Sequence, residues 1–215
     1  MLRRRRRLVA FAGASVPDGA RQKAVRFCPP IKRGDLGRVM EEESSPDTAI
    51  LIIDGVFGES LALTLSECRL CLEAGYALYG CSSIGALRAA DGWSIGMVGI
   101  GYVYELLRTG KIVDDSEVAV RYSACLTEEL TFSGVRLRYM VRQLVDDGCL
   151  DYVMGRRLLQ RCLYVPWYER ILPLVADTFW AAGVGDQFER LAGVSFNPKV
   201  LDAVAALRLL GARPW

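Results

Sequence analysis

A strand, a two-residue turn and a helix, lying along residues 76–91, constrain the fold of this chain more than any other feature. Residues 76–81 are a short apolar run typical of a buried strand, and residues 84–90 are a run of good helix formers. Only Ser82 and Ser83 separate the two, so the turn is tight. Such a turn brings hydroxyl groups and unsatisfied backbone N–H groups to one place. We therefore predict that it holds a nucleophile, an oxyanion or a bound anion.

The same turn approaches the nucleophile-elbow pattern Gly-x-Ser-x-Gly, with Cys81 in place of the first glycine. Ser83 is then the best nucleophile candidate, with Ser82 beside it, because Gly85 lets another backbone approach closely. The alternative is that one of the serines only caps the following helix. The chain contains no histidine, so a Ser-His-Asp triad cannot form within it. Any base would be a carboxylate, a lysine or the substrate itself.

Strands and helices alternate along the first half of the chain, which is the pattern of a parallel sheet with right-handed crossovers. The predicted strands are residues 8–14, 25–28, 48–53 and 76–81, and the predicted helices are residues 35–43, 60–75, 84–90 and 102–109. The continuous apolar run at residues 48–53 indicates a strand that is covered on both faces. Residues 92–101 hold four glycines and are predicted to be a loop.

From about residue 123, the sequence predicts helices only. Residues 134–148, 151–163, 167–182 and 197–210 carry apolar residues at helical spacing. The fold class predicted is α/β: a parallel-sheet core with flanking helices, followed by a helical C-terminal subdomain. We expect a flexible basic tail over residues 1–7, the α/β core over residues 8–122 and the helical subdomain over residues 123–215.

Three segments follow predicted strands and should meet at the carboxyl edge of the sheet, where ligands bind in open α/β folds. They are residues 13–17, Asp54 with Gly55, and the serine turn. Asp54 is the strongest acidic candidate because it ends an Ile-rich buried strand; alternatively, it closes a turn with Gly55. Asp115, in an acidic loop, is a further candidate, although with Asp114 it could instead cap a helix.

Arg88 lies about one turn into the helix that follows the serines. A guanidinium offers two parallel donors, so Arg88 could clamp a carboxylate or thiocarboxylate. The alternative is a salt bridge from Arg88 to Asp91 or Glu67.

Composition argues against several other functions. The formal net charge is only +2 and five consecutive arginines occupy residues 3–7, so the body is near neutral and nucleic acid is not an expected partner. No run of 18 apolar residues exists, and no membrane span is expected. Seven cysteines without regular spacing favour a reducing, cytoplasmic environment. Cys68 and Cys71 are predicted to be small buried residues on one helix face, and we expect no metal site and no cofactor.

Several motifs resemble those of TfuA-like proteins. Residues 83–90, Ser-Ile-Gly-Ala-Leu-Arg-Ala-Ala, are similar to the family hallmark, which is usually Ser-Met-Gly followed by Ala-Leu-Arg-Ala-Ala-Glu. Residues 52–57 resemble an Ile-Asp-Gly-x-Phe segment, residues 96–101 a glycine-rich loop, and residues 114–119 an acidic segment of the family. Weaker similarities lie at residues 13–17 and 33–36. The matches run in family order over just over half of the chain.

The resemblance implies a partner of a YcaO enzyme in backbone thioamidation of peptides. The YcaO enzyme activates an amide oxygen with ATP, and sulfur replaces that oxygen. The TfuA-like protein would help to deliver the sulfur by hydrolysing the thiocarboxylated C-terminus of a small sulfur-carrier protein. On the matching positions, the expected catalytic residues are Asp54, Ser82, Ser83 and Asp115, and the expected substrate-binding residues are Ser15, Arg33, Gly55, Gly85 and Arg88.

Two other functions stay open at this point. One is a non-catalytic docking or allosteric partner of the YcaO enzyme, in which the serine turn is only structural. The other is a small-anion or nucleotide-binding protein that uses the carboxyl edge of the sheet.

Overall fold

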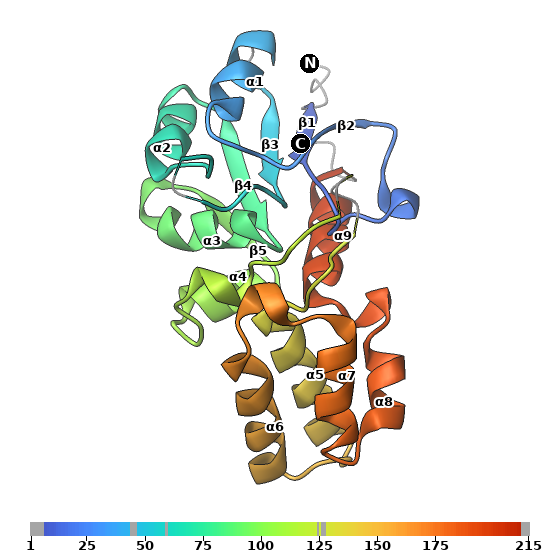
Figure 1. Ribbon diagram of the computed structural model, residues 1–215. Helices are drawn as coiled ribbons and strands as arrows, with labels where there is room; N and C mark the ends of the chain where they lie inside the picture. Colours follow the sequence, from blue (N-terminus) through green and yellow to red (C-terminus); the bar gives the residue numbers. More distant parts are fainter. Residues whose placement is uncertain (1–6, 44–46, 59, 124, 126–127, 212–215) are drawn as a thin grey trace. The chain divides into compact units, whose positions relative to one another are not determined.

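The computed structural model describes residues 7–43, 47–58, 60–123, 125 and 128–211, and these form two compact units (Figure 1). The first unit comprises residues 1–113 together with residues 199–215, and the second comprises residues 114–198. From the sequence we expected the boundary after residue 122, with all later residues in the second unit. In the structure, the last helix belongs to the first unit. Apart from Arg7, the predicted basic tail lies outside the described residues.

Five parallel strands form the sheet of the first unit, in the order β2-β1-β3-β4-β5 (Figure 1). They are β1 (Leu8–Phe11), β2 (Val25–Cys28), β3 (Ala49–Ile52), β4 (Ala77–Cys81) and β5 (Val98–Ile100). The predicted α/β fold is confirmed, and β1 to β4 match predicted strands. The prediction of a loop over residues 92–101 was wrong where β5 forms: this strand has three residues, one of them glycine, and only its pairing with β4 defines it.

The strand order places a topological switch point between β1 and β3. The chain leaves β1 for β2 on one side and later returns to β3 on the other side of β1. In open α/β folds, ligands bind at the carboxyl edge beside such a switch point, which is where the loops that follow β1 and β3 lie.

Five of the helices that the structure describes belong to the first unit. They are α1 (Asp35–Glu43), α2 (Leu65–Glu73), α3 (Ile84–Asp91), α4 (Tyr102–Arg108) and α9 (Pro198–Gly211), with short 3-10 turns η1 (Asp18–Ala20) and η2 (Trp93–Ile95). The helix predicted from residue 60 begins later, because Thr64 is its N-cap. Thr64 Oγ1 accepts a hydrogen bond from the backbone N–H of Glu67, whose carboxylate accepts one from the N–H of Thr64.

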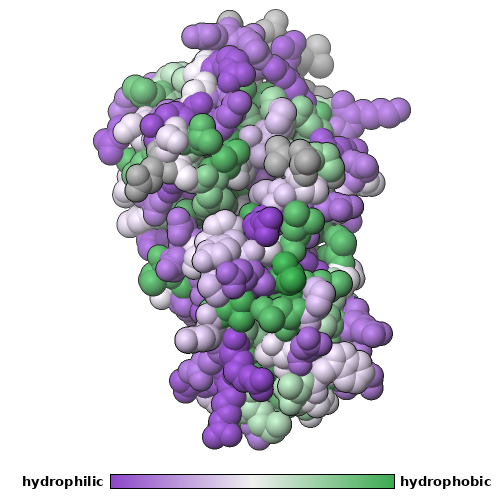
Figure 2. Space-filling view, in the orientation of Figure 1, coloured by the Kyte–Doolittle hydropathy of each residue, from purple (hydrophilic) through white to green (hydrophobic). Residues whose placement is uncertain are grey.

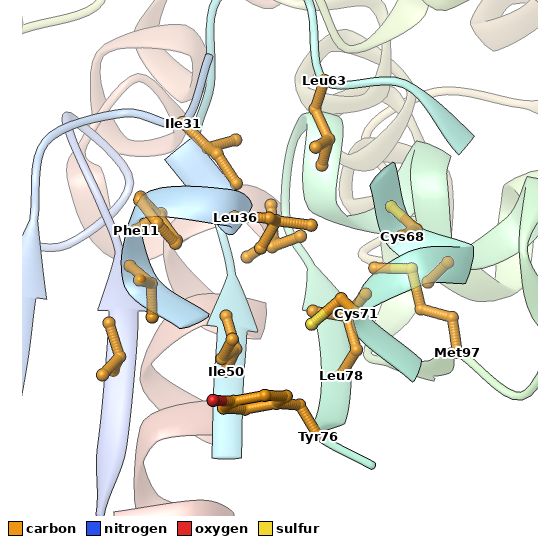
Figure 3. Close-up of a cluster of buried hydrophobic side chains, with 14 of the residues drawn as sticks. Phe11, Ile31, Leu36, Ile50, Leu63, Cys68, Cys71, Tyr76, Leu78 and Met97 are labelled. Carbon is orange, nitrogen blue, oxygen red and sulfur yellow. The ribbon is translucent and has the colours of Figure 1, made fainter. Parts of the chain in front are cut away.

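Both faces of the sheet are buried. Phe11 and Ile50 lie on one face and pack with side chains of α1, α2 and α3, among them Leu36 and Cys71 (Figure 3). Leu51, of opposite parity, lies on the other face, where α9 packs. The sequence predicted the two-sided burial of β3, but not that the last helix provides one of its two covers.

Cys68 and Cys71 are confirmed as buried residues on one face of α2. Burial raises the pKa of Cys68 to about 12 and that of Cys71 to about 11, so both are protonated thiols at neutral pH. They belong to the core beside Leu78 and Met97 (Figure 3).

The second unit is helical and has a core of its own. Its elements are η3 (Asp115–Glu117), α5 (Gly134–Asp146), α6 (Tyr152–Tyr164), η4 (Trp167–Glu169), α7 (Leu172–Trp180), α8 (Gly185–Leu191) and η5 (Val194–Phe196). The rings of Phe132 and Phe179 lie 5.9 and 5.0 Å from that of Phe188 at the centre of the core. The helix predicted over residues 167–182 is split, because Pro173 is tolerated only in the first turn of α7. The segment that forms α8 was not predicted to be helical.

Among the described residues, no helix combines the length and the hydrophobicity that a bilayer span requires.

Candidate active site

The serine turn joins β4 directly to α3, as predicted. Ser82 has a φ of 68°, the one positive φ among the non-glycine residues that the structure describes. This left-handed conformation is unfavourable for residues with a Cβ, and such strain concentrates at functional sites. The N–H of Ser83 donates to the carbonyl oxygen of Ile53 (3.3 Å) and to that of Cys81 (2.9 Å), which ties the turn to the end of β3.

Both serine side chains are fully buried, and within the described part of the chain neither Oγ has a hydrogen-bond partner. Ser83 occupies the N-cap position of α3, yet its hydroxyl makes no capping bond. The alternative that a serine is present only to cap this helix is therefore not supported. A buried hydroxyl without a partner costs roughly 1–3 kcal/mol. Two such hydroxyls side by side at a helix N-terminus mark a place where a ligand can bind.

Two glycines of the predicted site bring α3 close to β3. A Cβ on Gly85 would lie 1.9 Å from the carbonyl oxygen of Ile52, so any side chain there would push the helix away from the strand. A Cβ on Gly55 would lie 2.6 Å from Cγ2 of Ile84 and 2.7 Å from the carbonyl oxygen of Ile31. Both glycines therefore set the shape of the turn through close packing with the protein's own atoms.

Asp54 lies at the switch point and joins the ends of β1 and β3. Its side chain is fully buried. Oδ2 accepts hydrogen bonds from the N–H groups of Gly13 (2.8 Å) and Ser15 (3.0 Å), and Oδ1 accepts one from Oγ of Ser15 (2.6 Å). Ser15 and Asp54, distant in sequence, thus meet as the predicted carboxyl edge requires. With both oxygens engaged, Asp54 fixes the loop that follows β1.

The last helix contributes a carboxylate that sequence reasoning did not single out. Asp202 on α9 is buried and accepts hydrogen bonds from the N–H groups of Tyr102 and Val103, both at 2.8 Å. Burial raises the pKa of Asp202 to about 6. Burial, together with the nearby carboxylates of Asp202 and Asp54, also raises the pKa of the Cys81 thiol. The available signal was the one acid in a largely apolar helix.

The two arginines that the sequence predicted to bind substrate, Arg88 and Arg33, make other contacts in the structure. Arg88 donates from Nε to the carbonyl oxygen of Leu63 (2.7 Å) and from Nη1 to Asp91 (2.8 Å), which is the salt bridge that sequence analysis named as the alternative. Arg33 is exposed, and its backbone N–H donates to the carbonyl oxygen of Leu61 (2.8 Å).

Asp115 belongs to the second unit, where it is exposed at the start of η3. Its neighbour Asp114 caps that turn by accepting a hydrogen bond from the N–H of Ser116 (2.8 Å), and this bond lowers the pKa of Asp114. The residues that the first unit brings together are therefore Ser15, Asp54, Ser82 and Ser83, with Gly55 and Gly85 shaping the turn.

A family model described as TfuA-like protein matches residues 54–171, a little over half of the chain. The chain belongs to the TfuA-like family. The matched segment starts at Asp54 and includes the serine turn, and it ends before α9. TfuA-like proteins are associated with YcaO-dependent thioamidation. No curated protein in the comparison matches this TfuA-like chain.

Proposed function

We propose that this TfuA-like protein delivers sulfur to a YcaO enzyme during backbone thioamidation, by hydrolysing the thiocarboxylated C-terminus of a small sulfur-carrier protein. The observation that supports this most is the pair of buried serine hydroxyls without partners, carried by a strained turn. Acyl transfer requires a nucleophile and a donor to the oxyanion close together, and two buried hydroxyls on adjacent residues support this assignment.

In the overall reaction, the thiocarboxylate and one water molecule give a carboxylate and hydrogen sulfide. Ser82 is the nucleophile in this proposal, because its strained backbone is the part of the turn that packing alone does not explain. Its Oγ forms a bond to the thiocarboxylate carbon, the C–S bond breaks, and sulfur leaves with the electron pair and the serine proton as the hydrosulfide anion. Water then cleaves the acyl ester, releasing the carboxylate and a proton and restoring the serine.

This sequence of steps suits a chain without histidine, because the departing sulfur accepts the serine proton in the first step. Ser83 donates its hydroxyl hydrogen to the carbonyl oxygen, on which negative charge develops. Asp54 holds the loop of Ser15 in place at the edge of the sheet and thereby shapes the site.

Mass spectrometry of a thiocarboxylated sulfur-carrier protein tests the proposal, with this protein added alone and with its YcaO partner. We expect the carrier to exchange one sulfur for one oxygen. Ser82→Ala and Ser83→Ala should each lower the rate roughly 100- to 1000-fold, the usual cost of losing a group that acts in the transition state. Ser94→Ala is the matched control, because Ser94 is an exposed serine of the same unit. A carrier mass that stays unchanged when the partner is present would contradict hydrolysis.

A second candidate function, a non-catalytic docking partner of the YcaO enzyme, is favoured by apolar side chains on the surface of the second unit. Tyr152, Tyr164 and Trp180 are 68%, 92% and 53% exposed, and hydrophobic residues lie among hydrophilic ones on the visible face (Figure 2). In this function, the double variant Ser82→Ala/Ser83→Ala would support thioamidation as well as the wild-type protein does.

A further inference from the structure

We propose that the exposed face of α6 binds an acidic amphipathic helix of a protein partner. This face carries three arginines, Arg156, Arg157 and Arg161, and the helix contains no acidic residue. Such binding goes beyond the proposed function and does not depend on it, because α6 belongs to the second unit and the serine turn to the first.

The three arginines of α6 carry positive charge that the described part of the chain does not neutralise. All three are exposed, and their guanidinium groups take part in none of the hydrogen bonds or ion pairs of the described residues. Arg138 on α5, by contrast, is paired with Glu117. Arg157 and Arg161 lie four residues apart, a spacing at which like charges repel each other on a helix. Carboxylates of a partner would relieve this repulsion.

Two hollows flank the exposed face of α6, which packs against α5 and α7 (Figure 1). The hollow between α5 and α6 has a volume of about 590 Å³. Its apolar lining is buried or half-buried and consists of Val141, Val145, Leu159 and Leu163. Arg156 lines this hollow, whereas Arg157 and Arg161 line the one toward α7. Gln160 lines both, so the two hollows border one continuous surface.

The combination of apolar hollow and exposed arginines determines the chemistry of the occupant. An amphipathic helix places apolar side chains at positions i, i+3 or i+4 and i+7, which is how helices bind in apolar grooves. Glutamates beside that apolar stripe would each accept two parallel hydrogen bonds from a guanidinium group. Tyr152 and Tyr164, at the two ends of α6, are 68% and 92% exposed, and tyrosine is enriched at protein interfaces. Nucleic acid would engage the arginines but not the apolar lining, so a protein helix fits better.

Fluorescence anisotropy with three labelled synthetic peptides tests this binding. The first peptide is an amphipathic helix of leucine and glutamate, the second has glutamine in place of each glutamate, and the third has alanine in place of each leucine. The full-length protein should bind the first peptide at least about tenfold more tightly than either of the others, and added salt should weaken that binding.

Reversing the charge of the α6 face should abolish the preference for the acidic peptide. Arg157→Glu/Arg161→Glu should weaken binding of the first peptide at least about tenfold, because carboxylates would then meet carboxylates. Arg69→Glu/Arg208→Glu is the matched control, since it makes the same change of charge at two exposed arginines of the first unit, and it should bind as the wild-type protein does.

Several results would overturn the assignment. Equal affinity for the glutamate and glutamine peptides would show that the arginines do not select charge, and equal affinity for the leucine and alanine peptides would show that the hollow holds no apolar anchor. Single-stranded RNA or anionic lipid vesicles that bind more tightly than the acidic peptide would assign the face to another class of partner. The comparison of peptides on the wild-type protein does not depend on whether a variant folds. Sulfide release from the carrier is measured separately, so failure here leaves the proposed function untouched.

Discussion

Ser82 combines two unfavourable features in one residue, a left-handed backbone and a buried hydroxyl without a partner. Either feature alone lowers stability, and natural proteins retain such features where function needs them. Asp54 is the contrasting case at the same edge, because its carboxylate accepts three hydrogen bonds and so stabilises the loop of Ser15. The site thus combines a strained turn with a rigid support.

Replacing Ser82 by glycine should give a more stable protein than replacing it by alanine, without restoring activity. Gly adopts a positive φ without steric cost, whereas alanine keeps the strain of the serine. We expect Ser82→Gly to unfold with a free energy about 1 kcal/mol higher than that of Ser82→Ala in urea denaturation. Both variants should lose sulfide release, because both lack the hydroxyl. Equal stability of the two variants would show that the turn is not strained.

The elements of the sheet differ in how far local sequence determines them. β1, β3 and β4 could be predicted because continuous apolar runs are needed on strands buried on both faces. β5 could not, since its three residues include Gly99 and only pairing with β4 makes them a strand. Helix α9 was predicted as a helix, but its packing on the sheet arises from contacts between residues very distant in sequence, which periodicity does not reveal.

The candidate site, like the sheet, could be predicted from the sequence only in part. The contact between Asp54 and the loop of Ser15 could be predicted, because the carboxyl ends of parallel strands lie at the same edge of the sheet. The strain at Ser82 and the hydrogen bonds of Asp202 to the start of α4 could not, because both depend on how α3 and α9 pack within the first unit.

Asp202 accepts hydrogen bonds that join α9 to the start of α4. Because the pKa of this buried carboxyl is raised, the free energy of unfolding should depend on pH. The pKa of Asp202 is about 6 in the folded protein against a reference value of 3.8, so between these values the folded state binds more protons than the unfolded state. The free energy of unfolding should therefore fall as pH rises from about 4 to about 6, by up to about 1 kcal/mol per pH unit from this group. Urea denaturation across this range should show the slope in the wild-type protein and a smaller slope in Asp202→Asn. Identical slopes would exclude Asp202 as its source.

At the scale of the whole molecule, a helical unit is inserted into the chain of an α/β unit. The second unit has its own buried core around Phe132, Phe179 and Phe188. The first unit, in contrast, is built from two pieces of chain, because α9 covers one face of the sheet. Residues 1–113 alone would leave side chains such as Leu51 and Ile53 exposed to water.

The two units should therefore behave differently as fragments. Residues 114–198, produced alone, should be helical by circular dichroism and should melt cooperatively, because their core is complete. Residues 1–113 should aggregate, and a peptide spanning residues 199–211 should improve their solubility by covering the bare face. Residues 1–113 that stay monomeric without the peptide would show that α9 is dispensable for the sheet.

The return of α9 to the sheet also has a consequence for how the protein is made. The ribosome synthesises the strands and the serine turn first, then the entire helical unit, and only afterwards the helix that carries Asp202. During that interval the nascent chain has a sheet with one uncovered face. A chain whose translation stops before residue 199 thus keeps an uncovered apolar face, and we expect it to aggregate rather than to accumulate as a folded protein.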